Sequence, residues 1–181
     1  CAQSAYYPTE VETYPLLETD AIVDDALDCH RRGIGRYSVV TSGRSLTAEE
    51  TKDLCQSYRT VKCQCGISLC ASHGLLTKKQ FQQLKAAGVA RYHCNLETSR
   101  RFFSQICTTH TYDDKIAALR AAASAGLELC SGGIFGMGET MEDRIDMVID
   151  IRELGITSVP VNVLNPIPGT PFAKLPKLTE D

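Results

Sequence analysis

The sequence predicts an α/β fold, specifically part of a (β/α) TIM-type barrel. Helical segments alternate with short apolar, strand-like runs, and no hairpin signal joins two of these runs. Polar or sulfur-bearing residues also stand at the carboxyl end of strand after strand. Alternation of this kind requires right-handed crossovers and a parallel sheet, either doubly wound or closed. We favour the closed form, because a barrel gathers its active site at the carboxyl ends of its strands.

The helices are predicted from local start and stop signals. Thr47 with Glu50, and Thr77 with Gln80, form capping boxes in which a hydroxyl residue is followed three positions later by Glu or Gln. Weaker boxes with Asp in the third position start at Thr111 and Thr140. A glycine follows each helical pattern where a left-handed cap is needed, at Gly33, Gly88, Gly126 and Gly155.

Between the helices we expect five strands, and therefore about five βα units. Residues 131–139 are rich in glycine and are predicted to be a strand-to-helix connection. No shift in composition divides the chain, so residues 1–181 are expected to form a single domain. Because the chain begins with Cys1 and ends in a polar run, we expect it to be truncated at both ends, without the first strand and the C-terminal strands of the barrel. The predicted strands are 36–41, 66–70, 90–95, 127–130 and 157–162.

Composition excludes several classes of function. The 181 residues carry a net charge of −3 without basic runs, which argues against nucleic acid as a partner. No run approaches the roughly 18 apolar residues of a membrane span, so we expect a cytoplasmic protein without membrane association. Nine scattered cysteines indicate reduced thiols or metal ligands rather than a disulfide framework.

Several polar and sulfur-bearing residues fall at the predicted strand ends, where a barrel brings them to one mouth. Side chains alternate along a strand, so Asn95 and Glu97 face one way and Cys94 faces the other. Plain core packing remains an open alternative for Cys70 and Cys130. Three further cysteines are expected to pack in the core, namely Cys29, Cys55 and Cys107. The residues expected at the mouth are Cys70, Asn95, Glu97, Cys130 and Asn162.

Other common catalytic signatures are missing from the sequence. The glycines of residues 131–139 do not have the G-x-G-x-x-G spacing, and no G-K-[ST] phosphate loop follows. The four histidines form no H-E-x-x-H pair, and neither Ser-Gly pair has the setting of a nucleophile elbow. Ordinary hydrolase chemistry is therefore not expected.

An ordered set of motifs resembles the biotin synthase family of radical S-adenosylmethionine (SAM) enzymes over nearly the whole chain. The motifs are Cys1-Ala-Gln-Ser4, Asn95-Leu-Glu-Thr-Ser99, Thr108-Thr-His-Thr-Tyr112, Cys130-Ser-Gly-Gly-Ile134 with Gly136-Met-Gly-Glu139, and Val159-Pro-Val-Asn162 with Gly169-Thr-Pro171. The resemblance implies a radical SAM sulfurtransferase that converts dethiobiotin to biotin, the last step of biotin biosynthesis.

The resemblance also assigns cofactors. Cys1 matches the last cysteine of the C-x₃-C-x₂-C triad that holds a [4Fe–4S] cluster, and the other two cysteines lie outside this sequence, so the chain alone is expected to be inactive. Glu97 matches the position that binds the ribose of SAM, and the stretch from Ile134 to Met137 matches the one that packs on its adenine. Lys115 stands where some relatives carry an Arg for the SAM carboxylate.

Asn95 and Asn162 match positions that contact dethiobiotin, and Asn95 also borders the SAM site. For the auxiliary iron–sulfur cluster, usually [2Fe–2S] with three cysteines and an arginine, Cys70 and Cys130 match two ligands. The third cysteine position aligns with Ser38, whereas Cys94 stands where the usual enzyme has a histidine. The resemblance therefore implies a variant cluster, with Cys94 as a replacement ligand, or with Cys94 as a packed thiol and Ser38 as a weak oxygen ligand.

The resemblance further implies a homodimer that takes electrons from flavodoxin or ferredoxin. Two alternatives belong to the same superfamily: a hydrogenase-maturation enzyme and a methylornithine-synthase-like enzyme. A third is a non-catalytic, cysteine-rich barrel. A phosphate-binding barrel enzyme of sugar metabolism would place a lysine at a strand end, and we find none there.

Overall fold

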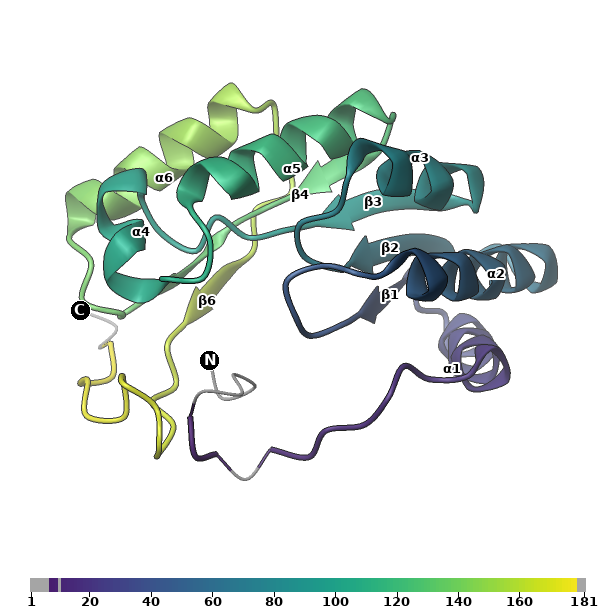
Figure 1. Cartoon of the computed structure of the whole chain (residues 1–181), viewed down its shortest axis with the longest axis horizontal. Helices are drawn as coiled ribbons and strands as arrows, with labels where there is room; N and C mark the ends of the chain where they lie inside the picture. The colour runs from purple at the N-terminus through teal and green to yellow at the C-terminus, as the bar shows by residue number, and fades with distance from the viewer. Residues whose placement is uncertain (1–6, 10, 179–181) are drawn as a thin grey trace. The chain divides into compact units, whose positions relative to one another are not determined.

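The computed structural model describes residues 7–9 and 11–178 as an alternation of helices and strands (Figure 1). The chain consists of two compact units. Unit 1 comprises Cys1–Thr13, Asn95–Asp113 and Ser131–Asp181, and unit 2 comprises Tyr14–Cys94 and Asp114–Cys130. The single-domain organisation of the chain stays a prediction, and each unit is described by itself.

Unit 2 contains a four-stranded parallel sheet in the order β1-β2-β3-β4. Figure 1 shows these strands side by side in that order, as strict βα alternation predicts. Four of the five predicted strands are thereby confirmed, with ends shifted by a few residues. The strands are β1 (Arg36–Val40), β2 (Ser68–Ser72), β3 (Val89–His93) and β4 (Glu128–Cys130).

One face of this sheet packs on helices. Tyr92 of β3 is fully buried and meets the Phe81 ring edge-on, with ring centroids 4.7 Å apart. Leu54 and Tyr58, from the helix that spans Ala48–Gln64, are buried as well. Side chains alternate along a strand. Arg91 and His93, which flank Tyr92, therefore point to the opposite face of the sheet. The helices that belong wholly to unit 2 are α1 (Thr19–Arg31), α2 (Ala48–Gln64) and α3 (Lys78–Ala86).

Unit 1 contains a two-stranded parallel sheet of β5 (Gly133–Phe135) and β6 (Val161–Val163). The β6 strand confirms the end of the fifth predicted strand. The expectation that residues 131–139 form only a connection is wrong, because residues 133–135 pair with β6. Three residues that include a glycine carry too little periodicity to indicate a strand. The helices α4 (Arg100–Ile106) and α6 (Met141–Glu153) pack together in this unit, and α5 (Tyr112–Ser124) begins in unit 1 and continues in unit 2.

The predicted helix signals act as expected. Thr47, Thr77 and Thr140 each form a complete capping box, and the four predicted cap glycines all have positive φ. The short helix α4 was not foreseen, because its cap, Ser99, is followed three residues later by Phe102 rather than an acid or amide. Among the described residues, no helix has the length and apolar character needed to cross a membrane.

Candidate functional site

Four side chains on one face of the unit 2 sheet form two neighbouring pairs. Ser38 lies beside Cys70 across β1 and β2, and His93 lies beside Cys130 across β3 and β4. The His93 Nδ1 atom is 3.3 Å from the Cys130 Sγ atom, and the Ser38 side chain is hydrogen-bonded to Cys70. We call these four residues the cysteine face; it lies opposite the face that Tyr92 buries against the helices.

An ion pair borders the cysteine face. Arg91 donates from Nε and Nη2 to the Glu128 Oε2 atom at 3.1 and 2.9 Å. Arg91 is the register partner of both Cys70 on β2 and Glu128 on β4. The Arg91–Glu128 ion pair therefore lies two residues before His93 on β3 and Cys130 on β4. The sheet therefore presents thiol, imidazole and charged groups where a buried apolar face is the usual pattern.

The local environment alters the acidity of two of these groups. Burial raises the pKa of the Cys70 thiol, and the hydrogen bond with Ser38 partly opposes that shift. Burial, and after it the charge of Lys115, lower the pKa of His93. The structure thus brings Lys115, on α5, near His93 within unit 2. A neutral imidazole is the form that binds metals.

Cys94 is not brought together with the other two candidate cysteines. It is buried, at 6% exposure, and follows Tyr92 on the helix-facing side, as strand alternation predicts. Its backbone N–H donates to the Cys130 carbonyl of β4 at 3.0 Å. Cys55 is buried as expected, whereas the expectation of core packing is wrong for Cys29 and Cys107, which are partly exposed.

A second group of predicted site residues meets in unit 1. The Glu97 N–H donates to the Gly132 carbonyl at 3.1 Å, and the Ile134 N–H donates to the Glu97 carbonyl at 2.9 Å, so Glu97 extends the small sheet beside β5. On the other side of β5, Ile134 is the direct register partner of Asn162. Glu97, Ile134 and Asn162 therefore lie on three adjacent segments.

Glu97 has an unusual backbone conformation. Its φ is 74°, and among the described residues it is the one non-glycine residue with positive φ. Such a conformation costs about 1–3 kcal/mol and tends to occur where function fixes a side chain. The strain singles out the position that the family resemblance assigns to the ribose of SAM.

The remaining unit 1 candidates are tied to the glycine-rich segment. Asn95 Oδ1 accepts a hydrogen bond from the Gly132 N–H at 3.0 Å, and Ser131 Oγ accepts one from the Leu96 N–H at 3.2 Å. Met137 is buried. Asn95 and Glu97 are both partly exposed and flank the buried Leu96.

Glu139 and Arg144 are structural determinants of this segment that sequence reasoning missed. The buried Glu139 carboxylate accepts hydrogen bonds from the Gly136 and Met137 N–H groups at 2.8 and 2.7 Å. It also accepts from Arg144 Nε at 2.8 Å, and the Arg144 guanidinium covers the Phe135 ring. Desolvation alone would raise the pKa of Glu139, but these hydrogen bonds outweigh it and lower the pKa. The signal in the sequence was an acid that closes a glycine-rich loop, followed five residues later by an arginine.

Two sequence predictions are not tested by this geometry. Cys1 lies outside the described residues. Cys70 and Cys130 belong to unit 2, and Asn95, Glu97 and Asn162 belong to unit 1, so their meeting at one mouth stays a prediction. In the part of the chain that is described, no three His, Cys, Asp or Glu side chains are close enough to hold one metal ion.

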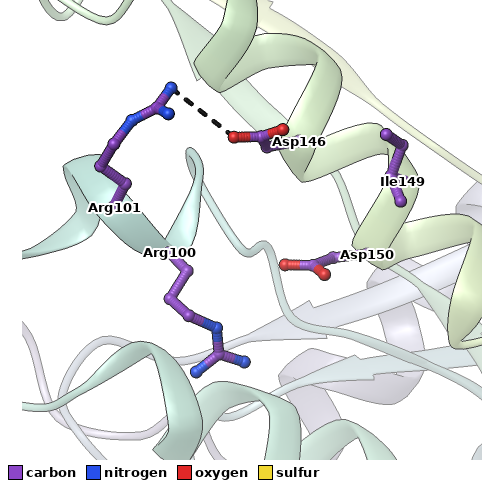
Figure 2. A pocket seen from close by; sticks show the side chains of 5 residues that line it. All are labelled: Arg100, Arg101, Asp146, Ile149 and Asp150. Carbon is purple, nitrogen blue, oxygen red and sulfur yellow. Dashed lines mark ion pairs between the residues drawn. The ribbon is translucent and has the colours of Figure 1, made fainter.

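A separate pocket in unit 1 lies between α4 and α6 (Figure 2). Its charges are largely compensated: Arg101 pairs with Asp146 at 3.6 Å, and Asp150 accepts a hydrogen bond from the Tyr112 hydroxyl at 2.7 Å. No predicted site residue lines this pocket. Its lining is Arg100, Arg101, Asp146, Ile149 and Asp150.

Comparison with known sequences gives a consistent result. The Radical SAM superfamily profile matches residues 1–151. The chain is 62% identical over all 181 residues to a biotin synthase of Akkermansia muciniphila, and 54% identical over the same length to one of Clostridium botulinum. It covers 56% and 57% of those proteins, so the chain spans about half the length of the curated relatives it matches.

Solved structures show the same fold at low sequence identity. A methylornithine synthase matches 99% of the chain with a TM-score of 0.87 at 18% identity, and the chain covers 53% of that structure. A maturase of the [FeFe]-hydrogenase matches 99% of the chain with a TM-score of 0.77 at 17% identity, with 43% of that structure covered. This likeness confirms the predicted fold class, a partial (β/α) TIM-type barrel.

Proposed function

Because the chain belongs to the radical SAM superfamily, we propose that it is part of a biotin synthase, which inserts sulfur into dethiobiotin to form biotin. The observation that carries the proposal is 62% identity to a biotin synthase over all 181 residues. The cysteine face adds support that does not depend on overall similarity, since sulfur insertion needs an auxiliary iron–sulfur site and this face offers thiol and imidazole donors.

The cofactors supply the difficult chemistry. When bound, SAM and the [4Fe–4S] cluster provide a radical that removes hydrogen from unactivated carbons of dethiobiotin, and the auxiliary cluster provides the sulfur. Cys1 is proposed as one of the three ligands of the [4Fe–4S] cluster. The chain carries no complete C-x₃-C-x₂-C triad, so we propose that it is inactive by itself.

The unit 1 residues fit a SAM site by their chemistry. The Glu97 carboxylate is suited to accept hydrogen bonds from two ribose hydroxyls, and its strained backbone holds it at the edge of β5. The apolar Ile134 and buried Met137 provide a surface for the adenine. From unit 2, Lys115 is proposed to supply a positive charge for the SAM carboxylate, without the bidentate fork of an arginine.

Substrate recognition is assigned to two amides. Asn162 is exposed on β6, directly beside Ile134, and its side chain offers both a donor and an acceptor for the ureido ring of dethiobiotin. Asn95 accepts a hydrogen bond from the Gly132 N–H through Oδ1, which fixes the orientation of its amide. Held in this way, the two amides orient the substrate rather than react with it.

The cysteine face is proposed as the auxiliary cluster site, with Cys70 and Cys130 as thiolate ligands. Both thiols belong to one face, and each has a polar partner within hydrogen-bonding distance, Ser38 or His93. A packed-core role for the two cysteines is disfavoured, because a hydrophobic thiol needs no polar partner. Cys94 was the other candidate ligand, and its burial on the helix-facing side favours its role as a packed thiol.

The alternative radical SAM functions are less well supported. The methylornithine synthase and the hydrogenase maturase share the fold at 17–18% identity, whereas the biotin synthases reach 50–62%. A non-catalytic barrel does not account for the strained Glu97 or for the polar cysteine face. We further propose a cytoplasmic homodimer that takes electrons from flavodoxin or ferredoxin, as the resemblance implies.

The test uses the full-length protein, reconstituted under anaerobic conditions with iron and sulfide. Incubated with SAM, a reductant and dethiobiotin, it is expected to form biotin together with 5′-deoxyadenosine, both detected by mass spectrometry. Cys70→Ala and Cys130→Ala should abolish biotin and retain deoxyadenosine, because they remove the sulfur-donating site only. Cys63→Ala, at an exposed cysteine, is the control. Deoxyadenosine without biotin in the unmodified protein would contradict the proposed substrate.

A further inference from the structure

Asp143, in the first turn of α6, is a buried carboxylate that belongs to none of the sites described above. Its side chain is only 4% exposed. The Oδ1 atom accepts hydrogen bonds from Ser99 Oγ at 2.6 Å and from Arg101 Nε at 3.1 Å. The Oδ2 atom accepts from the N–H and from the hydroxyl of Thr140, both at 2.8 Å. Both oxygens are therefore occupied, and each is bonded to a different element of unit 1.

The hydrogen bonds of Asp143 join the starts of two helices. Ser99 is the N-cap of α4, and its Oγ atom also accepts from the Phe102 N–H at 3.0 Å. Thr140 is the N-cap of α6, and its Oγ1 atom accepts from the Asp143 N–H at 3.2 Å. The bonds between Thr140 and Asp143 complete a capping box by themselves. The bonds from Ser99 and Arg101 are additional to that box and fix α4 against α6.

Each of these helix starts follows a segment that is proposed to contact SAM. Glu97, proposed to bind the ribose, stands two residues before Ser99. Met137, proposed to contact the adenine, stands three residues before Thr140. The backbone of Glu97 is paired with β5, at the amino end of the glycine-rich segment. Asp143 joins the two segments again at their carboxyl ends.

The strained backbone of Glu97 needs such a second attachment. Its φ is 74°, and a conformation of this kind persists only where the surrounding structure holds it on both sides. The pairing with β5 fixes one side. On the other side Thr98 is buried, and within the described part of the chain its Oγ1 atom has no hydrogen-bond partner. The first side-chain hydrogen bond after Glu97 is therefore the one from Ser99 to Asp143.

We propose that Asp143 is a positioning residue for the SAM site, which through Ser99 holds Glu97 in the backbone conformation that presents its carboxylate to the ribose. This inference rests on the proposed function, and in particular on the ribose role of Glu97. The hydrogen bond from Ser99, and after it the one from the Thr140 N–H, hold the pKa of Asp143 well below its usual range. Asp143 is therefore ionised at neutral pH and accepts from both helix starts at once. An asparagine would keep one acceptor oxygen and turn an NH₂ donor toward the remaining donors.

The experiment measures how well the protein recognises the ribose, without relying on turnover. The full-length protein, reconstituted under anaerobic conditions with iron and sulfide, is titrated with SAM and with its 2′-deoxy analogue by calorimetry, without reductant or dethiobiotin. The unmodified protein should bind SAM about tenfold or more tightly than the analogue, because a hydrogen bond to a charged group is lost. Glu97→Ala should abolish this preference.

Two variants and one control test the role of Asp143. Asp143→Asn should reduce the preference for SAM over the analogue by about fivefold or more, because Glu97 is then free to leave its strained conformation. Ser99→Ala breaks the same link from the α4 side, should have the same effect, and decides the question should Asp143→Asn not fold. Asp146→Asn is the matched control. It makes the same change on α6 at another partner of Arg101, 51% exposed, and should leave the preference intact.

The outcomes separate a positioning role from a merely structural one. A lower unfolding temperature with equally weakened binding of both ligands, so that the preference is unchanged, would overturn the inference. Equal loss of the preference in Asp146→Asn would overturn it as well. No preference in the unmodified protein would overturn both the inference and the ribose role of Glu97. A preference that falls in Asp143→Asn, together with no biotin from the unmodified protein, would support the inference and contradict only the proposed substrate.

Discussion

His73 is a fully buried histidine that belongs to no predicted site. Its Nε2 atom is 2.9 Å from the Tyr58 hydroxyl, its Nδ1 atom is 3.1 Å from Thr41 Oγ1, and its backbone N–H donates to the Tyr92 hydroxyl at 3.1 Å. Burial lowers the pKa of His73 to about 4. The network joins the ends of β1 and β2 to α2 and β3, which fixes the loops next to the cysteine face.

This histidine predicts a dependence of stability on pH. The unfolded chain binds a proton to His73 near pH 6.5 and the folded chain only near pH 4, so protonation favours unfolding in this window. The stabilising contribution is complete above about pH 6.5 and is lost as the pH falls toward 4, with a magnitude on the order of 3 kcal/mol.

Denaturant unfolding of the full-length protein at several pH values measures this effect. In the His73→Gln variant the stability should change less between pH 6.5 and 4 than in the unmodified protein. His30→Gln, at an exposed histidine of α1, is the control and should keep the original slope. Equal slopes in the His73→Gln variant and the unmodified protein would contradict the prediction.

Glu139 offers a second test at the scale of one residue. Glu139→Gln removes the negative charge from a carboxylate that holds two backbone N–H groups and Arg144, and breaking such a buried pair costs about 3 kcal/mol. We expect that loss in the free energy of unfolding, and a severalfold weaker binding of SAM measured by calorimetry. Glu142→Gln, at a side chain 83% exposed, should cost less than about 1 kcal/mol. Similar losses in both variants would refute the role of Glu139.

At the scale of elements, β5 depends on close backbone contact. A Cβ atom on Gly132 would lie 1.8 Å from the Pro160 carbonyl oxygen, so only glycine fits where the chain enters this strand. Gly132→Ala should therefore destabilise the protein by about 3 kcal/mol or more, measured by thermal unfolding. Gly66→Ala, where no atom lies within 4 Å of the added Cβ, should change stability by less than about 1 kcal/mol. A tolerated Gly132→Ala would show that this segment is packed differently.

The same elements show what the sequence could and could not predict. Helix starts at Thr47, Thr77 and Thr140 were predictable because a capping box is complete within four residues. The β5 strand was not, since its pairing partner β6 lies almost thirty residues further along the chain. Pairings between distant segments leave no local signature in a three-residue strand.

In the candidate site, too, some features were predictable from the sequence and others were not. Strand ends and alternation predicted that Cys70 and Cys130 occupy one face and that Cys94 points away from Asn95. The contact between His93 and Cys130 depends on the register between β3 and β4, which the sequence alone does not specify. Likewise, Glu139 could be seen only as part of a motif, because its role lies in hydrogen bonds to the backbone.

At the scale of the whole molecule, the fold class agrees with the prediction from alternating elements, and the superfamily agrees with the resemblance of the motifs. A methylornithine synthase shares the fold at 18% identity, so the barrel by itself does not determine the substrate. The proposed substrate depends on the residues of the two units, Glu97 and Asn162 in one and Cys70 and Cys130 in the other. These residues must act on the same molecule for the proposed reaction to occur.

One measurement tests that requirement most directly. Dethiobiotin deuterated at the two carbons that receive sulfur is incubated with the full-length, anaerobically reconstituted protein, SAM and a reductant, and both products are analysed by mass spectrometry. The account predicts biotin together with 5′-deoxyadenosine that has acquired deuterium from the substrate. Deoxyadenosine that forms without deuterium, and without biotin, would contradict it, because the radical would then act on a different molecule.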